Sequence, residues 1–538
     1  MGLPSDNYPL GSTPGFGFAN YLIYFGKVTS LGDHVAFSGF YAFLIPLGLL
    51  LVHRQMREGG AETALVTGSV ALVAAVYFSR VVHPNYLIPA AVLLPVGVLT
   101  RRLRADLALV PLLLFALAVE IAERGVFRTT WAQAVAADLP GRLGGLAAAL
   151  APRAGPALTQ DPLGLFFSAT AGGFAIAWLT AAMAGAGRRV RLGVLAVAGA
   201  LVVAVPLLVM VRVGDRTGLI RAQDPAVVQS AGDAKRLVAG RSPYTPPPED
   251  TPRGREAYAS SFRLDPPVEI RPDQPKVPPG LSVLATLGRL VDRRDIRLWT
   301  LFALAVLAAL VARRAAGEGK TTALALALFP APLALGTVLG APLALALSAL
   351  FGAWLRARAG PPWASGLLVG AAAALDHRAL LLAPLLLLPL ASRPRAWRPA
   401  LGGAVAVYAL VVIPVALLDL PAFVGRLFTA SSPGAGLGVF NLFAYWGEEA
   451  STAARVLAAL TPLAGILVTA ALLRGRGAPP VALAGLAALA WVALAPSVSP
   501  DAVGVPIVLL GMAALLNGGE EAPAGTGAEG GGVDGDTG

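Results

Sequence analysis

The chain has 538 residues, of which 56% are hydrophobic and only 14% are charged, and its formal net charge is +11. Soluble domains carry about 25% charged residues, so this composition excludes an ordinary soluble enzyme. The basic residues stand in short clusters between apolar runs, a distribution typical of membrane topology signals rather than of nucleic-acid binding. The chain has no cysteine, which excludes disulfides and thiolate metal sites.

Apolar runs along the chain predict membrane-crossing helices. Judged against the roughly 20 residues that cross a bilayer, about fifteen runs qualify, several of them short. They cover 35–52, 64–80, 84–99, 105–122, 162–184, 192–213, 297–313, 321–335, 341–355, 364–375, 379–391, 400–419, 452–473, 480–496 and 501–516. We expect the short runs between 321 and 391 to be half-helices or pairs fused into bent helices. Because helices satisfy their own backbone hydrogen bonds in lipid, the sequence predicts an all-α, polytopic transmembrane helical bundle.

Clusters of basic residues predict the orientation of this bundle. They fall in short connections and comprise Arg54 with Arg57, Arg101–Arg102–Arg104, Arg188–Arg189–Arg191, Arg313–Arg314 with Lys320, Arg356 with Arg358, Arg393–Arg395–Arg398, and Arg474 with Arg476. With the runs above, every cluster lies on one side of the membrane, which the positive-inside rule makes cytoplasmic. The opposite side then receives 1–33, 123–161, 421–451 and one long extracytoplasmic loop, 214–296.

The end of the chain has a different composition from the rest. Residues 517–538 are rich in glycine and contain five acidic residues and no basic residue. Such a segment has nothing to pack into a core, so we expect a disordered cytoplasmic tail. The Ala-, Arg- and Gly-rich usage of the whole chain suggests a GC-rich bacterium, so we expect a multi-pass protein of a bacterial plasma membrane.

A sequence repeat links the two halves of the chain. Gly15 to Gly26 and Gly436 to Gly447 share the pattern GxGxxNxxxY(F/W)G, and each copy precedes three apolar runs in the same predicted orientation. The Asn and Tyr of the second copy, Asn441 and Tyr445, are candidates to face a substrate cavity. The alternative is a Gly-rich loop that only caps the three helices, since small residues are common in helix-packing loops.

This repeat suggests a division of the chain. Residues 1–130 form a partial transmembrane unit that matches the end of a longer one. Residues 131–190 provide an extracytoplasmic stretch and a connecting helix, and 191–516 form the complete transmembrane module.

The long loop carries the most informative motifs. Asp215 and Asp224 follow the 192–213 run, Leu237-Val-Ala-Gly240-Arg-Ser-Pro243-Tyr244 comes next, and Val277-Pro278-Pro279 leads back to the membrane. With Gly366-Leu-Leu-Val-Gly370, these motifs resemble the GT-C superfamily of polyprenyl-phosphate-sugar-dependent glycosyltransferases, especially its mannosyl- and arabinofuranosyl-transferase branch. Its members have an Asp after a transmembrane helix, then "LL-x-G-x-x-PY" and "YPP" segments. The resemblance covers about 190–516, with Val277 in place of the usual Tyr.

The resemblance implies a GT-C-like fold over 191–516 and a membrane glycosyltransferase. Its donor would be a polyprenyl-phosphate-linked sugar, and its acceptor an extracytoplasmic glycan, lipid or protein. No cofactor is certain, and a divalent metal requirement is open. The partners expected are therefore membrane lipid, the donor and the acceptor, and no nucleic acid.

Candidate residues follow from the reaction that the resemblance implies. A carboxylate must accept the proton of the attacking hydroxyl, and Asp224 is the first candidate, Asp215 the second and Asp233 the third. Each could instead be a solvated loop residue or a helix cap. The phosphate leaving group and the sugar need cationic, polar and aromatic side chains, for which the candidates are Arg241, Tyr244, His377, Arg378, Asn441 and Tyr445. Interfacial snorkelling is the alternative for the cations. No metal ligand is predicted.

A rival hypothesis is a non-catalytic membrane protein, such as a lipid carrier, transporter or scaffold with a diverged GT-C-like fold. Fold alone does not determine function. Broken helices at the midplane would favour a transporter. The parallel repeat and the polar residues gathered on one face favour the transferase.

Overall fold

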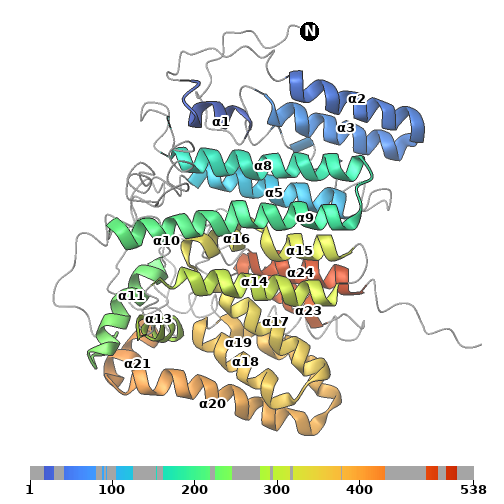
Figure 1. Cartoon of the computed structure of the whole chain (residues 1–538). Coiled ribbons are helices and arrows are strands. Elements are labelled where there is room, and N and C mark those ends of the chain that lie inside the picture. The colour runs from blue at the N-terminus through green and yellow to red at the C-terminus, as the bar shows by residue number, and fades with distance from the viewer. Residues whose placement is uncertain are drawn as a thin grey trace, which may run out of the picture.

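The computed structural model describes the greater part of the chain. The described ranges are 17–28, 41–79, 105–124, 161–217, 225–244, 279–290, 295–315, 319–376, 378–429, 480–494 and 504–517, with isolated positions at 86, 88–89, 92–93 and 153. Within them every regular element is helical, which confirms the all-α prediction for this part of the chain. The helices are stacked in layers along one direction of the molecule (Figure 1).

The first layers come from the first part of the chain. Their elements are α1 (Ala19–Tyr24), α2 (Tyr41–Glu58), α3 (Gly60–Tyr77), α5 (Ala105–Arg124) and α8 (Pro162–Met183). The start of α8 shows how the sequence sets a helix boundary. Asp161 accepts a hydrogen bond from the backbone N–H of Gly164 at 2.8 Å, and Pro162 occupies the first helical position. Both features favour a helix start.

A long helical element follows, made of α9 (Arg188–Gly199), the π-helical turn η3 (Ala200–Ala204) and α10 (Val205–Thr217). After it come α11 (Pro225–Val238), α13 (Gly280–Leu290), α14 (Arg297–Arg314), α15 (Gly319–Leu328), α16 (Ala331–Leu339) and α17 (Leu343–Ala359). The predicted run 321–335 is divided between α15 and α16, which meet at an angle of 47°. Pro330 stands at this break, where its ring and missing N–H end the regular helix.

The last elements are α18 (Pro362–Leu375), α19 (Arg378–Leu386), the 3-10 turns η4 (Leu388–Ser392) and η5 (Pro394–Ala396), α20 (Trp397–Ala416), α21 (Leu420–Thr429), α23 (Pro480–Leu494) and α24 (Gly504–Asn517). Gly366 and Gly370 of α18 face α20 closely. A Cβ atom at either position would overlap the backbone carbonyl oxygen of Ala400 or Ala404. Glycine thus lets the two backbones touch, as in small-xxx-small helix pairs of membranes.

Three described helices are long and apolar enough to cross a membrane, and the bent pair α15–α16 would make a fourth span. The three are Pro162–Met183, Arg188–Val211 and Trp397–Ala416. In α20 only 22% of the apolar stretch is buried. Its exposed side chains include Leu401 and Val405, more than half exposed. This face is suited to contact with lipid.

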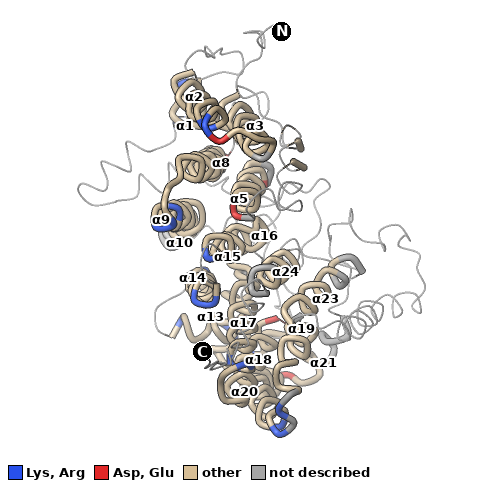
Figure 2. The backbone as a smooth tube through the Cα atoms, turned by 90° about the vertical axis from the view of Figure 1, so that its right-hand side faces the viewer, with Lys and Arg blue, Asp and Glu red and all other residues tan. Residues whose placement is uncertain are grey.

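Basic residues gather at one end of the helices. Figure 2 shows lysine and arginine at the ends of α9, α14 and α15 that face the viewer. The ranges agree: Arg188 and Arg189 begin α9, whereas Arg313 and Arg314 end α14. We name this side of the bundle the basic end. It matches the distribution from which the orientation was predicted.

One cluster of buried apolar side chains connects the layers. It runs from Tyr24 in α1 to Ala513 in α24. Helix α5 packs on α8 and also on α15 and α16. In the described residues, the predicted units 1–130 and 191–516 therefore share a core.

Candidate functional site

The helix ends opposite the basic end carry several buried polar residues. Helices α11 and α13 pack together there, the Tyr244 ring after α11 contacts Phe423 of α21, and α10 ends on the same side of the molecule (Figure 1). We name this region, together with the first turn of α14, the α11 end. This region includes parts of the predicted loop 214–296, to which the sequence analysis assigned the catalytic carboxylate.

Asp233 on α11 and Ser282 on α13 form the central contact of this region. The Ser282 Oγ donates a hydrogen bond of 2.7 Å to the Asp233 Oδ2, and both side chains are buried. Burial raises the pKa of Asp233 from 3.8 to about 6, although the Ser282 hydrogen bond and the charge of Arg236 lower it. A carboxyl group with such a pKa can accept or donate a proton near neutral pH.

Tyr244 lies next to this pair. Helix α11 ends at Val238, and Gly240 adopts a positive φ of 67°, which reverses the chain and is open to glycine at little cost. The Tyr244 ring then packs edge-on against Phe423 of α21, with centroids 5.0 Å apart. Burial raises the pKa of Tyr244, and Asp233 and Tyr408 raise it further through their charges. The "PY" of the predicted motif therefore interacts with the buried carboxyl.

The hydroxyl of Tyr244 is the unusual feature of this residue. Its oxygen is buried and has no hydrogen-bond partner among the residues that the structure describes. A buried hydroxyl normally has a partner, because leaving one unsatisfied costs about 1–3 kcal/mol. A partner outside the described residues, or a ligand, would satisfy this hydroxyl.

Two motifs that are far apart in the sequence meet at Gly280. A Cβ atom there would overlap the carbonyl oxygen of Ala374, near the end of α18. The start of α13 therefore lies against the turn that holds Asp376, which is buried. The predicted residue Arg378 begins α19 directly after this turn, although its side chain is outside the described part. His377 lies outside the described residues.

Arg297, which is buried, and Asp295, which is 12% exposed, add an ion pair at the start of α14. The Arg297 side chain is fully buried and donates from Nε to Asp295 Oδ1 at 2.9 Å, and from Nη2 to the carbonyl oxygen of Met210 on α10 at 3.3 Å. Its Nη1 has no partner in the described residues. Carbons of its side chain also border the turn at Gly340, where Val227 of α11 packs. The guanidinium is thus fixed between α10 and Asp295 at the start of α14.

Our sequence interpretation did not single out this pair. A signal was present, because Arg293, Arg294 and Arg297 stand at the start of an apolar run on the side expected to lack arginine. An arginine that departs from the topology rule needs a local reason, such as a buried partner. Asp295, two residues away, is that partner.

The predicted catalytic residues differ in how much of their surroundings the structure describes. Asp215 lies in α10, but its side chain is outside the described part, and Asp224 precedes the described start of α11. Pro225 and Asp233 are eight positions apart, which is about 12 Å along a helix. Because they are this far apart along the chain, Asp224 and Asp233 are alternative candidates for the base. Asp233, third in the sequence ranking, is the one with an observed environment.

The predicted substrate-binding residues also separate. Tyr244 lies near Asp233, whereas Arg241 is exposed after the end of α11. Asn441 and Tyr445 lie outside the described residues. Their counterparts in the first copy of the repeat, Asn20 and Tyr24, are buried, and Asn20 Nδ2 donates to Ser168 Oγ at 3.0 Å. In that copy the Asn and Tyr of the shared pattern contact α8, which favours the packing interpretation there.

Metal sites and similar proteins complete the description. Within the described residues, no group of three or more His, Asp or Glu side chains could hold a metal ion. No protein-family profile, curated protein or solved structure matches the chain.

Proposed function

We propose that this chain is a multi-pass membrane glycosyltransferase that transfers a sugar from a polyprenyl-phosphate donor at the α11 end. The observation that carries the proposal is the buried Asp233–Ser282 pair, with Tyr244 near enough for the charge of Asp233 to raise the pKa of Tyr244. A carboxyl with a pKa of about 6 suits a general base at neutral pH. The motif resemblance supplies the reaction class.

The reaction assigns a role to each group. An acceptor hydroxyl would replace Ser282 as the hydrogen-bond donor to Asp233 and pass its proton to the carboxylate. Its oxygen bonds to the anomeric carbon as the bond between that carbon and the phosphate oxygen breaks, and the polyprenyl phosphate leaves with the electron pair. Arg297 Nη1 and the Tyr244 hydroxyl are the donors proposed for the phosphate and the sugar. Release of the proton from Asp233 to water restores the base.

The proposed location follows from charge. If the basic end is cytoplasmic, the α11 end lies on the extracytoplasmic side, where a lipid-linked sugar and its acceptor would meet. We infer a plasma-membrane protein of a bacterium, with the GT-C-like module extending over 191–516.

The experiment is transfer of radiolabelled sugar from polyprenyl-phosphate donors in membranes that contain the wild type, Asp233→Asn or Asp224→Asn. We expect loss of transfer in Asp233→Asn and normal transfer in the control Glu58→Gln, which changes an acid at the basic end. Loss in Asp224→Asn alone would assign the base to Asp224 instead. Absence of transfer by a folded wild type with every donor would contradict the proposal.

A specific observation favours a second function, a lipid carrier or transporter. The bent pair α15–α16 has the geometry of a broken span or a re-entrant loop, and broken helices frequently mark transport pathways. A cavity of about 460 Å³ between α1, α8 and α10 is lined mainly by apolar and aromatic side chains, including Tyr24 and Phe166. Movement of a fluorescent polyprenyl phosphate across reconstituted vesicles, without sugar transfer, would support this alternative.

A further inference from the structure

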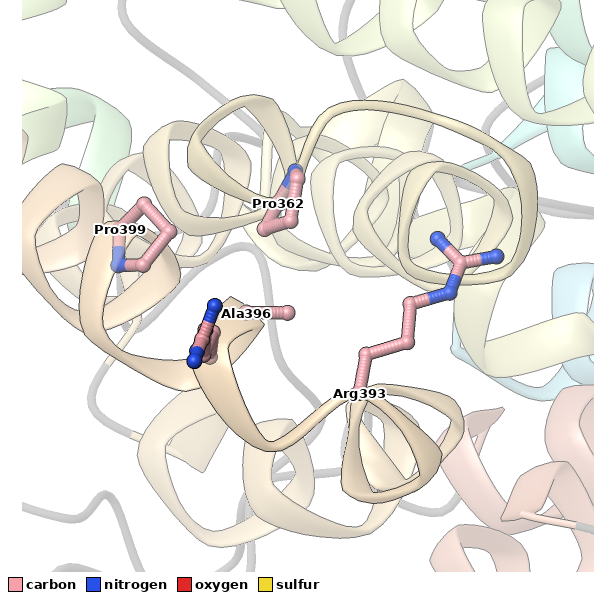
Figure 3. Close-up of a pocket in the computed structure, with 5 residues that line it drawn as sticks. Pro362, Arg393, Ala396 and Pro399 are labelled. Carbon is pink, nitrogen blue, oxygen red and sulfur yellow. The ribbon is translucent and has the colours of Figure 1, made fainter.

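The basic end contains a pocket that the transfer reaction does not use. It has a volume of about 450 Å³ and is lined by Pro362, Arg393, Arg395, Ala396 and Pro399. Figure 3 shows Ala396 between Pro362, Pro399 and the side chain of Arg393. Two arginines thus border a recess whose other lining residues are apolar.

The local fold holds Arg393 in place. Arg393 lies between the 3-10 turns η4 and η5, and its backbone carbonyl accepts a hydrogen bond of 2.8 Å from the N–H of Ala396. Its Nη2 donates to the carbonyl oxygen of Arg358 at 3.0 Å. One nitrogen therefore anchors the guanidinium to the end of α17. The other nitrogens leave it able to bind an anion, for which its planar donors are suited.

Two helix starts contribute to the same recess. Pro362 is the first residue of α18, and Ala396 and Pro399 flank the first turn of α20. No side chain caps either helix by a hydrogen bond. The positive ends of both helix dipoles therefore add to the field of the arginines.

The surface next to the pocket is apolar. Helix α20 leads away from it, and Leu410, 73% exposed, and Ile413, 52% exposed, lie on the same side of this helix as the pocket residue Pro399. A molecule with an anionic head and apolar chains would match both parts at once. A free anion would use only the arginines, and a soluble acidic peptide would leave the apolar stripe in water.

We propose that the pocket binds the headgroup of an anionic phospholipid, whose acyl chains lie along the exposed face of α20. Basic pockets between membrane helices on the cytoplasmic side bind such headgroups. Arg393 and Arg395 contact the phosphate, and the apolar lining accommodates the glycerol. The site is separate from the α11 end and does not depend on the proposed transfer reaction.

The test is native mass spectrometry of the full-length protein released from vesicles of equal parts phosphatidylglycerol and phosphatidylcholine. The wild type should retain phosphatidylglycerol with a preference of about tenfold or more over phosphatidylcholine, because each arginine near the surface favours anionic lipid. Arg393→Gln with Arg395→Gln should lose this preference. The matched control is Arg313→Gln with Arg314→Gln, which removes the same charge from the end of α14 and should retain it.

Several outcomes would overturn the proposal. An unchanged preference in the pocket variant, or an equal loss in the control, would show that the pocket is not the site. Displacement of the lipid by excess inorganic phosphate would indicate a site for the free anion. If phosphatidylglycerol binds only after the acidic residues of 517–538 are neutralised, the acidic tail rather than a lipid occupies the pocket in the wild type. If the double variant fails to fold, Arg395→Glu is the substitute test, because it leaves the Arg393 hydrogen bond to Arg358 in place. This variant should also lose the preference for phosphatidylglycerol.

Discussion

Arg191 on α9 donates from Nη1 to Asp106 Oδ2 on α5 at 2.7 Å, and the two side chains are 7% and 3% exposed. The guanidinium also lies 5.9 Å from the ring centroid of Trp178 on α8. This ion pair connects two helices 85 positions apart and joins the predicted units 1–130 and 191–516. It lies at the basic end, where α9 begins.

This pair provides the first prediction. Arg191→Met leaves the carboxylate of Asp106 buried without this partner, so the free energy of unfolding should fall by about 3–5 kcal/mol. The double variant with Asp106→Asn removes both charges and should recover part of the loss. Unfolding titrations in mixed detergent micelles measure both values. A single variant as stable as wild type would show that the pair does not hold α5 to α9.

The contact between α18 and α20 provides the second. Gly370→Ala places a Cβ atom against the backbone of Ala404, which cannot move away locally, so the variant should lose about 1–3 kcal/mol. Gly402→Ala on α20 is the matched control, because no atom lies within 4 Å of a Cβ atom built there. Thermal unfolding of the two purified variants compares them. Equal stability would mean that the close approach is not maintained.

The third prediction separates stability from function at Tyr244. Tyr244→Phe removes a buried hydroxyl that has no partner in the described part of the chain, so stability should not fall and should rise by up to about 1–3 kcal/mol. Sugar transfer should fall about tenfold, the effect of one lost hydrogen bond to substrate. Tyr244→Ala, by contrast, should cost about 3–5 kcal/mol because the ring packs on Phe423. Normal transfer by Tyr244→Phe would exclude the hydroxyl from the site.

The fourth prediction concerns stability against pH. The pKa of Asp233 is about 6 in the folded chain instead of 3.8, so folding favours the protonated form. This contribution to stability is fully present below 3.8 and is lost as the pH rises through about 6. Asp233→Asn cannot titrate, and its unfolding free energy should lack that fall. Parallel unfolding curves for wild type and variant across this range would contradict the assigned pKa.

Helix positions were predictable because long apolar runs and their boundaries are local signals. The run 105–122 corresponds to α5, and 162–184 to α8, whose start is marked by Asp161 and Pro162. The break at Pro330 was harder to place, since the apolar run continues on both sides of it. The bend lies within the single run 321–335, whereas we expected the short runs between 321 and 391 to be half-helices or to fuse in pairs, so this break was not predicted.

The site was less predictable for a physical reason. The environment of Asp233 depends on Ser282, which is 49 positions away, and no local pattern distinguishes that aspartate from Asp224 or Asp215. Burial of Arg297 likewise depends on α10 and on the turn at Gly340. The sequence motifs indicated this region and Tyr244. Which of its charged groups are buried depends on tertiary packing, which no local motif predicts.

The most direct test of Asp233 as the base is the pH dependence of sugar transfer by wild type and Ser282→Ala. In the wild type, transfer should increase as the pH rises through about 6, because the carboxyl must lose its proton to act. Ser282→Ala removes a hydrogen bond that lowers this pKa, so the same rise should occur at higher pH. A rise at the same pH in both proteins, or no transfer from any polyprenyl-phosphate donor, would contradict the account.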